Sequence, residues 1–370
     1  MAVPLTDLTR QHAELAEPLR DAFTRVTASG QLILGPHVRQ FEAELAEACG
    51  VKHAIGVSSG NDAILMALSA LDIGPGDEVI TTSLAYLHLA ESIARVGATP
   101  VFADIRPRTF NLDPETLPGL ITDKTKAILP THIFGLPAAM KTIREVADAH
   151  GLKVIEDCDM AIGASHHGRR TGSIGDVATM SFYPTKNLAA LGDAGAVLTD
   201  DDALAHRLRQ KRVHGLEPGF TVRELGGAFR LDGLQAAFLS VKLPHLQRWT
   251  ERRRELAARY SKLLGPLPVT TPFSAEEHEH VFNQYVLRVR SGGREPLRMH
   301  LDALGIGNRV YYPRPLHLQP CFAHLGYQPG ALPEAEKASA ELLALPMFPE
   351  MTRQEQDEVV DAVRDFFLGD

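Results

Sequence analysis

The sequence predicts an α/β fold with a mostly parallel sheet and a second, smaller domain. Short apolar runs of strand length alternate with amphipathic helical stretches from about residue 51 to residue 198, an alternation typical of βαβ units. Small and polar residues directly follow several of these runs, and sheets of this kind bind their ligands at the carboxyl ends of the strands. Beyond residue 201 helical patterns dominate, so a different packing unit is expected there.

Seven runs have the composition and length of strands, and helical stretches lie between several of them. The expected strands are 53–58, 78–82, 100–104, 127–131, 153–157, 177–182 and 195–198. The expected helices are 62–71, 138–149, 202–213, 244–264, 296–304 and 353–367, with one further strand at 282–289. The long helix that starts near 245 suggests a large domain at 1–245 and a small C-terminal α+β domain at 246–370.

Composition excludes several classes of protein. The chain has 370 residues, of which 44% are apolar and 23% are charged, so it is long and apolar enough for a folded core. A net charge of -8 does not indicate the basic surface that a nucleic-acid-binding protein requires. No apolar stretch is long enough to span a membrane, and the three widely spaced cysteines match neither a disulfide framework nor a zinc motif. We therefore expect a cytoplasmic protein.

The first candidate site motif follows the first expected strand. Ser58, Ser59, Gly60, Asn61 and Asp62 stand directly before a helical stretch. Small residues let a backbone approach a ligand closely, and the free N–H groups of a helix start can hold a phosphate. Ser59 or Asn61 could equally be an ordinary N-cap, so this motif alone decides nothing.

Two further motifs carry reactive side chains. Glu156, Asp157 and Asp159 end an apolar run, where a carboxylate can hold a cation, a metal or a protonated ring nitrogen, or merely cap a turn. Lys186 follows the next run through a Pro184 turn, which keeps its amine near the mouth of the sheet. An isolated lysine is usually a surface residue. The combination is more specific, because an amine, an acid and phosphate donors are what pyridoxal phosphate requires.

These motifs, in order along nearly the whole chain, closely resemble the DegT/StrS family of sugar aminotransferases. The matching segments are 59–63, 156–157, 181–187, 230–237, 312–319 and 345–349. The resemblance implies the fold of type I pyridoxal-phosphate-dependent transferases and a homodimer with active sites at the subunit interface.

The same resemblance implies roles for individual residues. Lys186 would form the Schiff base to the cofactor, and Asp157 would hold the pyridine nitrogen. Tyr86 would stack on the ring, while Ser181 and the backbone of Gly60 and Asn61 would bind the phosphate.

Several positions depart from the family pattern, and two of them would remove polar contacts to the cofactor. Met160 stands where a glutamine usually contacts the cofactor's phenolic oxygen, and Ala228 stands where an asparagine of the partner subunit usually reaches the phosphate. Loss of two ordinary hydrogen bonds predicts weaker cofactor retention.

The residues that flank Lys186 resemble family members that act at C-3 of the sugar. The expected substrate is therefore a nucleotide-linked 3-keto-6-deoxyhexose, with glutamate as the expected amino donor. Arg212 and Arg230 are candidates for the nucleotide phosphates, and His317 is a candidate substrate contact that could equally be a structural histidine.

Three other functions remain open, and no metal is expected. An NAD-dependent oxidoreductase is disfavoured, because no Gly-x-Gly-x-x-Gly motif follows the first expected strands. A sugar dehydratase with the same fold is disfavoured. The dehydratases that resemble this family have a histidine at the position of the Schiff-base lysine, where this chain has Lys186. A non-catalytic sugar-binding or regulatory protein is the third alternative. His166 and His167 are interpreted as a solvated turn, since adjacent strand residues point to opposite faces and no third ligand is evident.

Overall fold

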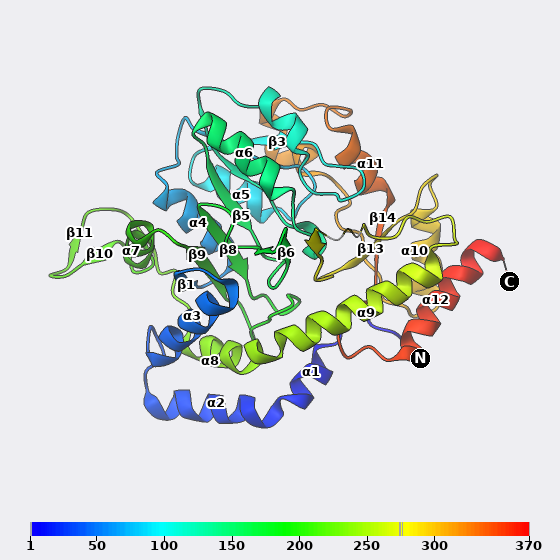
Figure 1. Ribbon diagram of the computed structural model, residues 1–370, viewed down its shortest axis with the longest axis horizontal. Coiled ribbons are helices and arrows are strands. Elements are labelled where there is room, and N and C mark those ends of the chain that lie inside the picture. The colour runs from blue at the N-terminus through cyan, green and yellow to red at the C-terminus, as the bar shows by residue number, and fades with distance from the viewer. Residues whose placement is uncertain (1, 274, 276, 370) are drawn as a thin grey trace.

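A seven-stranded mixed sheet forms the centre of the computed structural model, which describes residues 2–273, 275 and 277–369 (Figure 1). The strand order is β1-β9-β8-β5-β4-β2-β3. Only β9 runs antiparallel to its neighbours, β1 and β8, and the other pairs are parallel. The strands are β1 His53–Val57, β2 Glu78–Thr82, β3 Thr99–Ala103, β4 Thr125–Leu129, β5 Lys153–Asp157, β8 Val177–Ser181 and β9 Gly195–Thr199. The predicted mostly parallel sheet is confirmed.

Helices cover both faces of this sheet, because successive strand residues point to opposite sides and both sets are apolar. On β5, Ile155 packs into the core under α4 (Gly60–Ala70), α5 (His88–Arg95) and α7 (Asp202–Lys211). Its neighbour Val154 packs on the other face, under α6 (Met140–His150). The helices α3 (Pro36–Cys49) and α8 (Gly233–Lys242) cover that second face over β1, β8 and β9.

The C-terminal part is organised around a long helix. Helix α9 (Leu246–Leu264) crosses the molecule and leads to the two-stranded antiparallel sheet of β13 (Tyr285–Arg288) and β14 (Leu342–Leu345) (Figure 1). Helices α10 (Arg294–Ala303) and α12 (Arg353–Leu368) complete this unit. Its core also includes Val3 from the N-terminus, so the division at 245 stays a prediction.

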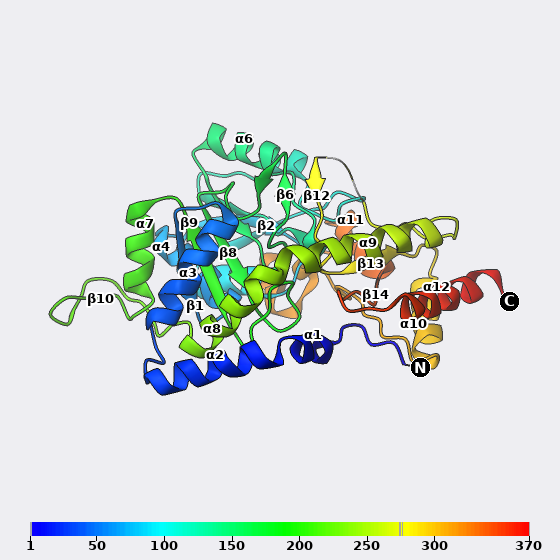
Figure 2. The same ribbon diagram turned by 60° about the horizontal axis from the view of Figure 1, so that its bottom comes forward.

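Several elements lie outside the predicted pattern. The N-terminal helices α1 (Leu8–Glu14) and α2 (Ala16–Ser29) run along one side of the molecule (Figure 2). Helix α11 (Pro333–Glu341) belongs to the C-terminal part in sequence but packs against Leu84 and Ile105 of the large part. The remaining short elements are β6 Ser165–His166, β7 Arg169–Arg170, β10 Leu216–Glu217, β11 Thr221–Val222, β12 His278–Glu279 and the 3-10 turns Pro114–Gly119, Ile133–Gly135, Leu243–His245, Leu316–Leu318 and Pro320–Leu325.

Among the described residues, no helix combines the length and the apolar character that a bilayer crossing requires.

Candidate active site

Lys186 stands on a braced loop that leaves the carboxyl end of β8. The backbone N–H of Lys186 donates to Tyr183 O at 2.8 Å, which closes a turn around Pro184. The neighbouring Asn187 is buried, and its side chain donates to Val281 O at 3.1 Å. Asn283 from the same crossing segment donates to Thr185 O at 3.2 Å. These hydrogen bonds fix the backbone of the loop at Lys186, and only 13% of the lysine side chain is exposed.

Two carboxylates and a histidine surround the amine of Lys186. Its Nζ lies 3.6 Å from Asp159 Oδ2, and His88 Nε2 lies 3.2 Å from the same oxygen. His88 Nε2 is also 3.8 Å from Asp157 Oδ2. Asp157 ends β5 and His88 begins α5, so each side chain stands just beyond the carboxyl end of a sheet strand. The carboxylate in contact with the Lys186 amine is that of Asp159, which lies between Lys186 and His88, and the role expected of Asp157 stays a prediction.

The pKa values in this cluster are strongly coupled. Burial lowers the pKa of His88, but the carboxylates of Asp157 and Asp159 more than offset this and raise it to about 9. Burial raises the pKa of Asp157, whereas the contacts with His88, the Thr131 hydroxyl and the charge of Lys186 bring it well below its usual range. At neutral pH Asp157 is therefore an anion and His88 a cation. An anion at Asp157 can keep a pyridine nitrogen protonated.

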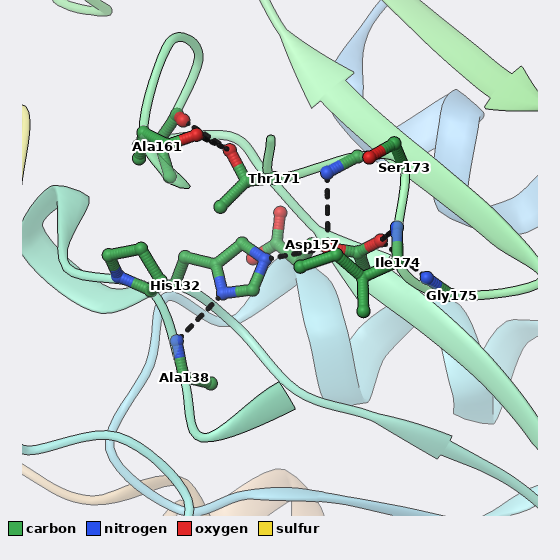
Figure 3. Close-up of polar contacts among 12 residues, drawn as sticks. His132, Ala138, Asp157, Ala161, Thr171, Ser173, Ile174 and Gly175 are labelled. Atoms are coloured by element: carbon green, nitrogen blue, oxygen red, sulfur yellow. Dashed lines mark hydrogen bonds and ion pairs between the residues drawn. The ribbon is translucent and has the colours of Figure 1, made fainter. Parts of the chain in front are cut away.

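Glu156 precedes Asp157 on β5 and points to the opposite face of the strand. It accepts hydrogen bonds from the backbone N–H groups of Gly172, Ile174 and Gly175 at 3.0, 2.6 and 2.6 Å. His132 Nε2 lies 3.1 Å from Glu156 Oε2, while Ala138 N donates to His132 Nδ1, so His132 is neutral and donates through Nε2. Figure 3 shows the His132–Ala138 contact and the Ile174–Gly175 turn across from it. Glu156 is a structural carboxylate.

The Glu156→Ala variant is expected to lose about 3–5 kcal/mol of unfolding free energy, because one side-chain and three backbone donors lose their partner. Burial raises the pKa of Glu156, but the contact with His132 and the backbone N–H groups lower it overall, below 4.5. The stabilisation is therefore complete above the unfolded pKa and is lost as the pH falls through the folded pKa. Urea unfolding at pH 7 checks this, with the exposed Glu145→Ala as a control that should change little. Equal stability of the two variants would contradict this role.

The candidate phosphate cradle is the N-terminus of α4. Ser59 is the N-cap and accepts from Asp62 N, while Asn61 Oδ1 accepts from Ser92 Oγ at 2.6 Å. Local hydrogen bonds therefore account for these side chains. The backbone N–H groups of Gly60 and Asn61 have no acceptor within the helix and remain free to bind a phosphate. A Cβ on Gly60 would meet Ser181 Cβ at 2.6 Å and Asp159 Oδ2 at 2.9 Å. The glycine therefore permits close approach of the cradle to Ser181.

Aromatic rings border the cluster. The Tyr86 ring lies 5.5 Å from the His88 ring and 6.1 Å from that of Tyr312, and 59% of Tyr86 is exposed. Tyr86 thus borders the same opening as His88 and is free to contact a bound ring. Met160 is buried and follows Asp159 directly.

The expected substrate residues have different environments. Arg212 is buried in an ion pair with Glu42 and donates to Gly56 O at 3.0 Å. Its charge is already compensated, so the expected contact with a nucleotide phosphate stays a prediction that this ion pair does not favour. Arg230 is partly exposed and has no ion pair or hydrogen bond within the described part of the chain, so it remains available.

His317 is a structural histidine. Its Nδ1 lies 2.6 Å from Ser83 Oγ, its Nε2 lies 3.1 Å from Glu336 Oε1, and the residue is 1% exposed. Both ring nitrogens are engaged within the chain, which favours the structural alternative over the substrate contact.

Sequence reasoning missed His88. Its position in the sequence could have indicated a site residue, because His88 lies a few residues beyond the expected strand 78–82 and close to Tyr86. A histidine in a helical pattern has an ordinary structural explanation, and only the fold brings its ring to Asp157 and Asp159.

The residues of the cluster fit pyridoxal phosphate. Lys186 provides the amine, Asp157 provides an ionised and buried acid, and the start of α4 provides unpaired N–H groups for a phosphate. Asp159 adds a negative charge to this site, which His88 and Lys186 balance.

Comparison with known proteins identifies the family. The model of the DegT/DnrJ/EryC1/StrS aminotransferase family matches residues 14–364. The chain is 49% identical to a pleiotropic regulatory protein of Geobacillus stearothermophilus, with 99% of each chain covered. It is 43% identical to the dTDP-3-amino-3,4,6-trideoxy-alpha-D-glucose transaminase of Streptomyces venezuelae, with 98% of this chain and 96% of that protein covered.

Solved structures confirm the predicted fold. DesV of S. venezuelae, solved in complex with a ketimine intermediate, superimposes with a TM-score of 0.96 at 42% identity, over 99% of this chain and 98% of that chain. NtdA of Bacillus subtilis, solved with bound cofactor PMP, gives a TM-score of 0.93 at 32% identity, over 99% and 85% of the two chains. The motifs, the fold and the family match agree, and the chain belongs to the DegT/DnrJ/EryC1/StrS aminotransferase family.

Proposed function

We propose that this protein is a pyridoxal-phosphate-dependent aminotransferase that transfers an amino group from an amino acid to a nucleotide-linked keto-sugar. The observation that carries the proposal is the convergence of Lys186, the ionised Asp157 and the glycine cradle of α4 at one edge of the sheet. Glutamate is the expected donor.

The bound cofactor supplies an aldehyde for the amino group and a ring that withdraws electrons from the reacting carbon. With the cofactor bound, Lys186 would hold its aldehyde carbon, and after the donor amine has replaced it there, the lysine amine would carry a proton between the donor α-carbon and the cofactor. The 3.6 Å contact with Asp159 directs the amine toward the cradle. Asp157 would keep the ring nitrogen protonated, and His88 keeps Asp157 ionised by lowering the pKa of its carboxyl.

The proposed acceptor is a nucleotide-linked 3-keto-6-deoxyhexose. The sequence around Lys186 favours reaction at C-3, and the Streptomyces relative is named for a sugar with an amino group at C-3. Arg230 is the available cation for the nucleotide phosphates. Its neighbour Phe229 accepts a backbone hydrogen bond from Ser58 at 3.2 Å, which places this segment beside the cradle motif.

The test is a two-step assay on purified protein loaded with pyridoxal phosphate. Glutamate should convert the bound cofactor to its amino form and release 2-oxoglutarate, and a dTDP-linked 3-keto-6-deoxyhexose should then restore the starting absorbance. The matched 4-keto sugar is the control for position. Failure of the glutamate step would overturn the aminotransferase proposal, whereas a preference for the 4-keto sugar would overturn only the position.

A regulatory or sugar-binding role is the second candidate, because the Geobacillus relative is named a pleiotropic regulatory protein. The same assay separates the two. Binding of the nucleotide sugar without glutamate-dependent turnover would favour the second candidate.

The Met160→Gln, Ala228→Asn double variant is expected to bind the cofactor more tightly. Two restored hydrogen bonds of about 1 kcal/mol each correspond to at most roughly thirtyfold in affinity. Titration of pyridoxal phosphate into the apoprotein measures the change, and the ranking of sugar acceptors should stay the same. Weaker binding of pyridoxal phosphate by the double variant than by the wild type would show that the two positions do not face the cofactor.

We further propose that two copies of the chain pair. The hairpin of β10 and β11 projects from the body in both views (Figures 1 and 2). Phe220 in its loop and Leu225, which follows β11, are each 88% exposed. Apolar side chains on a projecting arm are typical of an interface. Tyr86 and Tyr183, beside the site, are 59% and 51% exposed, so the site has room for a covering partner.

The Phe220→Asp, Leu225→Asp double variant is therefore expected to dissociate. Light scattering should give about twice the chain mass of 40.4 kDa for the wild type and a value nearer one chain for the variant. Met299→Asp on α10, at a side chain that is 61% exposed, is the matched control and should remain paired. A monomeric wild type, or a variant that pairs as well as the control, would refute the arm as the interface.

The proposed location is the cytoplasm. Cys49 and Cys158 are buried thiols, Cys321 is an exposed one, and none of the three forms a disulfide in the described chain. Unpaired cysteines are typical of reducing compartments.

A further inference from the structure

Asp157 already faces a cation, and this cation belongs to the chain itself. Its Oδ1 accepts from the backbone N–H of Asp159 at 3.1 Å, which leaves Oδ2 as the oxygen that carries an ion pair. His88 Nε2 lies 3.8 Å from this Oδ2, and His88 is a cation at neutral pH. The ring nitrogen of the cofactor requires the same buried carboxylate. The histidine and the ring nitrogen therefore compete for one acid.

Asp159 holds the other side of the His88 ring. Its Oδ2 lies 3.2 Å from His88 Nε2 and 3.6 Å from Lys186 Nζ. The same carboxylate lies against the start of α4, since a Cβ on Gly60 would come within 2.9 Å of Oδ2 and 3.1 Å of Oδ1. We name His88 and Asp159 the internal ion pair. This pair lies between Asp157, Lys186 and the cradle, where the cofactor ring is expected.

The internal ion pair is incompletely bonded. His88 Nδ1 and Asp159 Oδ1 are buried, and neither atom has a hydrogen-bond partner within the described residues. Buried polar atoms without partners are costly and rare in folded proteins. The internal ion pair therefore satisfies the site only in part, and both of its residues have hydrogen bonds to gain from a ligand.

We propose that the internal ion pair takes the place of the cofactor in the cofactor-free protein, and that His88 leaves Asp157 when the cofactor binds. The inference rests on the proposed role of Asp157 toward the ring nitrogen. His88 stays with Asp159, its closer partner, while the ring nitrogen becomes the cation at Asp157. Tyr86 and Leu87, directly before His88, are exposed, so the site is open beside the moving ring.

Removal of His88 should affect the two states of the protein unequally. In the cofactor-free protein, Asp157 and Asp159 would lose the cation that they share, which is costly for buried carboxylates. In the loaded protein, the ring nitrogen compensates Asp157, so the loss is smaller. A change that destabilises the cofactor-free protein more than the loaded protein tightens cofactor binding by the difference.

The experiment is a titration of the full-length protein, freed of cofactor, with two ligands. Pyridoxamine phosphate has the ring nitrogen and the phosphate but does not react with Lys186, and its deaza analogue has carbon in place of the ring nitrogen. His88→Gln, which keeps the size but not the charge, should bind pyridoxamine phosphate roughly tenfold to hundredfold more tightly than the wild type, the range of one buried contact with a charged group. The deaza analogue should gain nothing, because it brings no cation to Asp157.

Two further variants complete the titration. His88→Ala should show the same dependence on the ring nitrogen, which keeps the test decisive if the new glutamine forms a contact of its own. His324→Ala, at an exposed histidine, is the matched control and should bind both ligands as the wild type does.

Thermal unfolding provides a second readout. His88→Gln should lower the unfolding temperature of the cofactor-free protein more than that of the protein loaded with pyridoxamine phosphate, whereas loss of a merely structural residue would lower both equally. Unchanged or weaker binding of pyridoxamine phosphate by both His88 variants, or an equal gain for the deaza analogue, would overturn this inference alone. Absence of pyridoxamine phosphate binding in all four proteins would refute the proposed function as well.

Discussion

The Lys186→Ala variant is expected to fold normally and to lose transamination by at least about 10³-fold. Lys186 is the only side chain that we assign both to hold the cofactor aldehyde and to move the proton, and positioned proton transfer alone contributes about 10²–10⁴-fold. The fold should survive although the lysine is 13% exposed, because Asp159 keeps its 3.2 Å contact with His88. Removal of the amine therefore leaves no buried carboxylate alone.

The measurement is turnover with glutamate, together with borohydride treatment of the loaded protein. Reduction should attach the cofactor to the wild-type peptide that contains Lys186, and mass spectrometry should find no such attachment in the variant. Lys186→Arg keeps the positive charge but not the primary amine, so it should be equally inactive. Lys262→Ala on α9, at an exposed lysine, is the control and should retain full turnover. Attachment at another lysine, with activity preserved in Lys186→Ala, would end this assignment.

The central sheet could be predicted because each of its strands is a short apolar run that its own residues define. The predicted bounds of β2 and β5 agree with the structure, and those of the other sheet strands differ by one or two residues at one end or, for β3 and β4, at both ends. Helices α1 and α2 and strand β14 could not be found in the same way. The run Leu342–Leu345 is buried on all sides and pairs with β13 nearly sixty residues earlier, so neither alternation nor a local turn marks it.

The candidate site shows the same limit. Lys186 and Asp157 could be predicted because both stand at strand ends, where the fold itself gathers residues. Arg212 and His317 could not be judged from sequence, since a charged or polar side chain reveals nothing about its partner. Glu42, which pairs with Arg212, lies 170 residues away, and Ser83 lies 234 residues from His317. The contact between His166 and His278 escaped notice for the same reason, because the two residues are 112 positions apart and meet only in the folded chain.

The Asp157→Asn variant is expected to bind the cofactor but to convert it with glutamate about 10²–10³-fold more slowly. An amide carries no charge, so it cannot keep the ring nitrogen protonated, and one oriented electrostatic group is worth about this much in rate. Asp157 is 1% exposed and its lowered pKa keeps it ionised at neutral pH, which means that solvent does not substitute for the lost charge.

Asp159→Asn is the variant to compare with Asp157→Asn. Asp159 lies two residues after Asp157, and both carboxylates contact His88. Its removal should disturb the direction of the Lys186 amine and weaken turnover less, since the ring nitrogen keeps its partner. Single-turnover absorbance changes with glutamate, and separate titrations of cofactor affinity, distinguish a loss of chemistry from a loss of binding. A near-normal rate in Asp157→Asn with a large loss in Asp159→Asn would instead identify Asp159 as the acid that faces the ring.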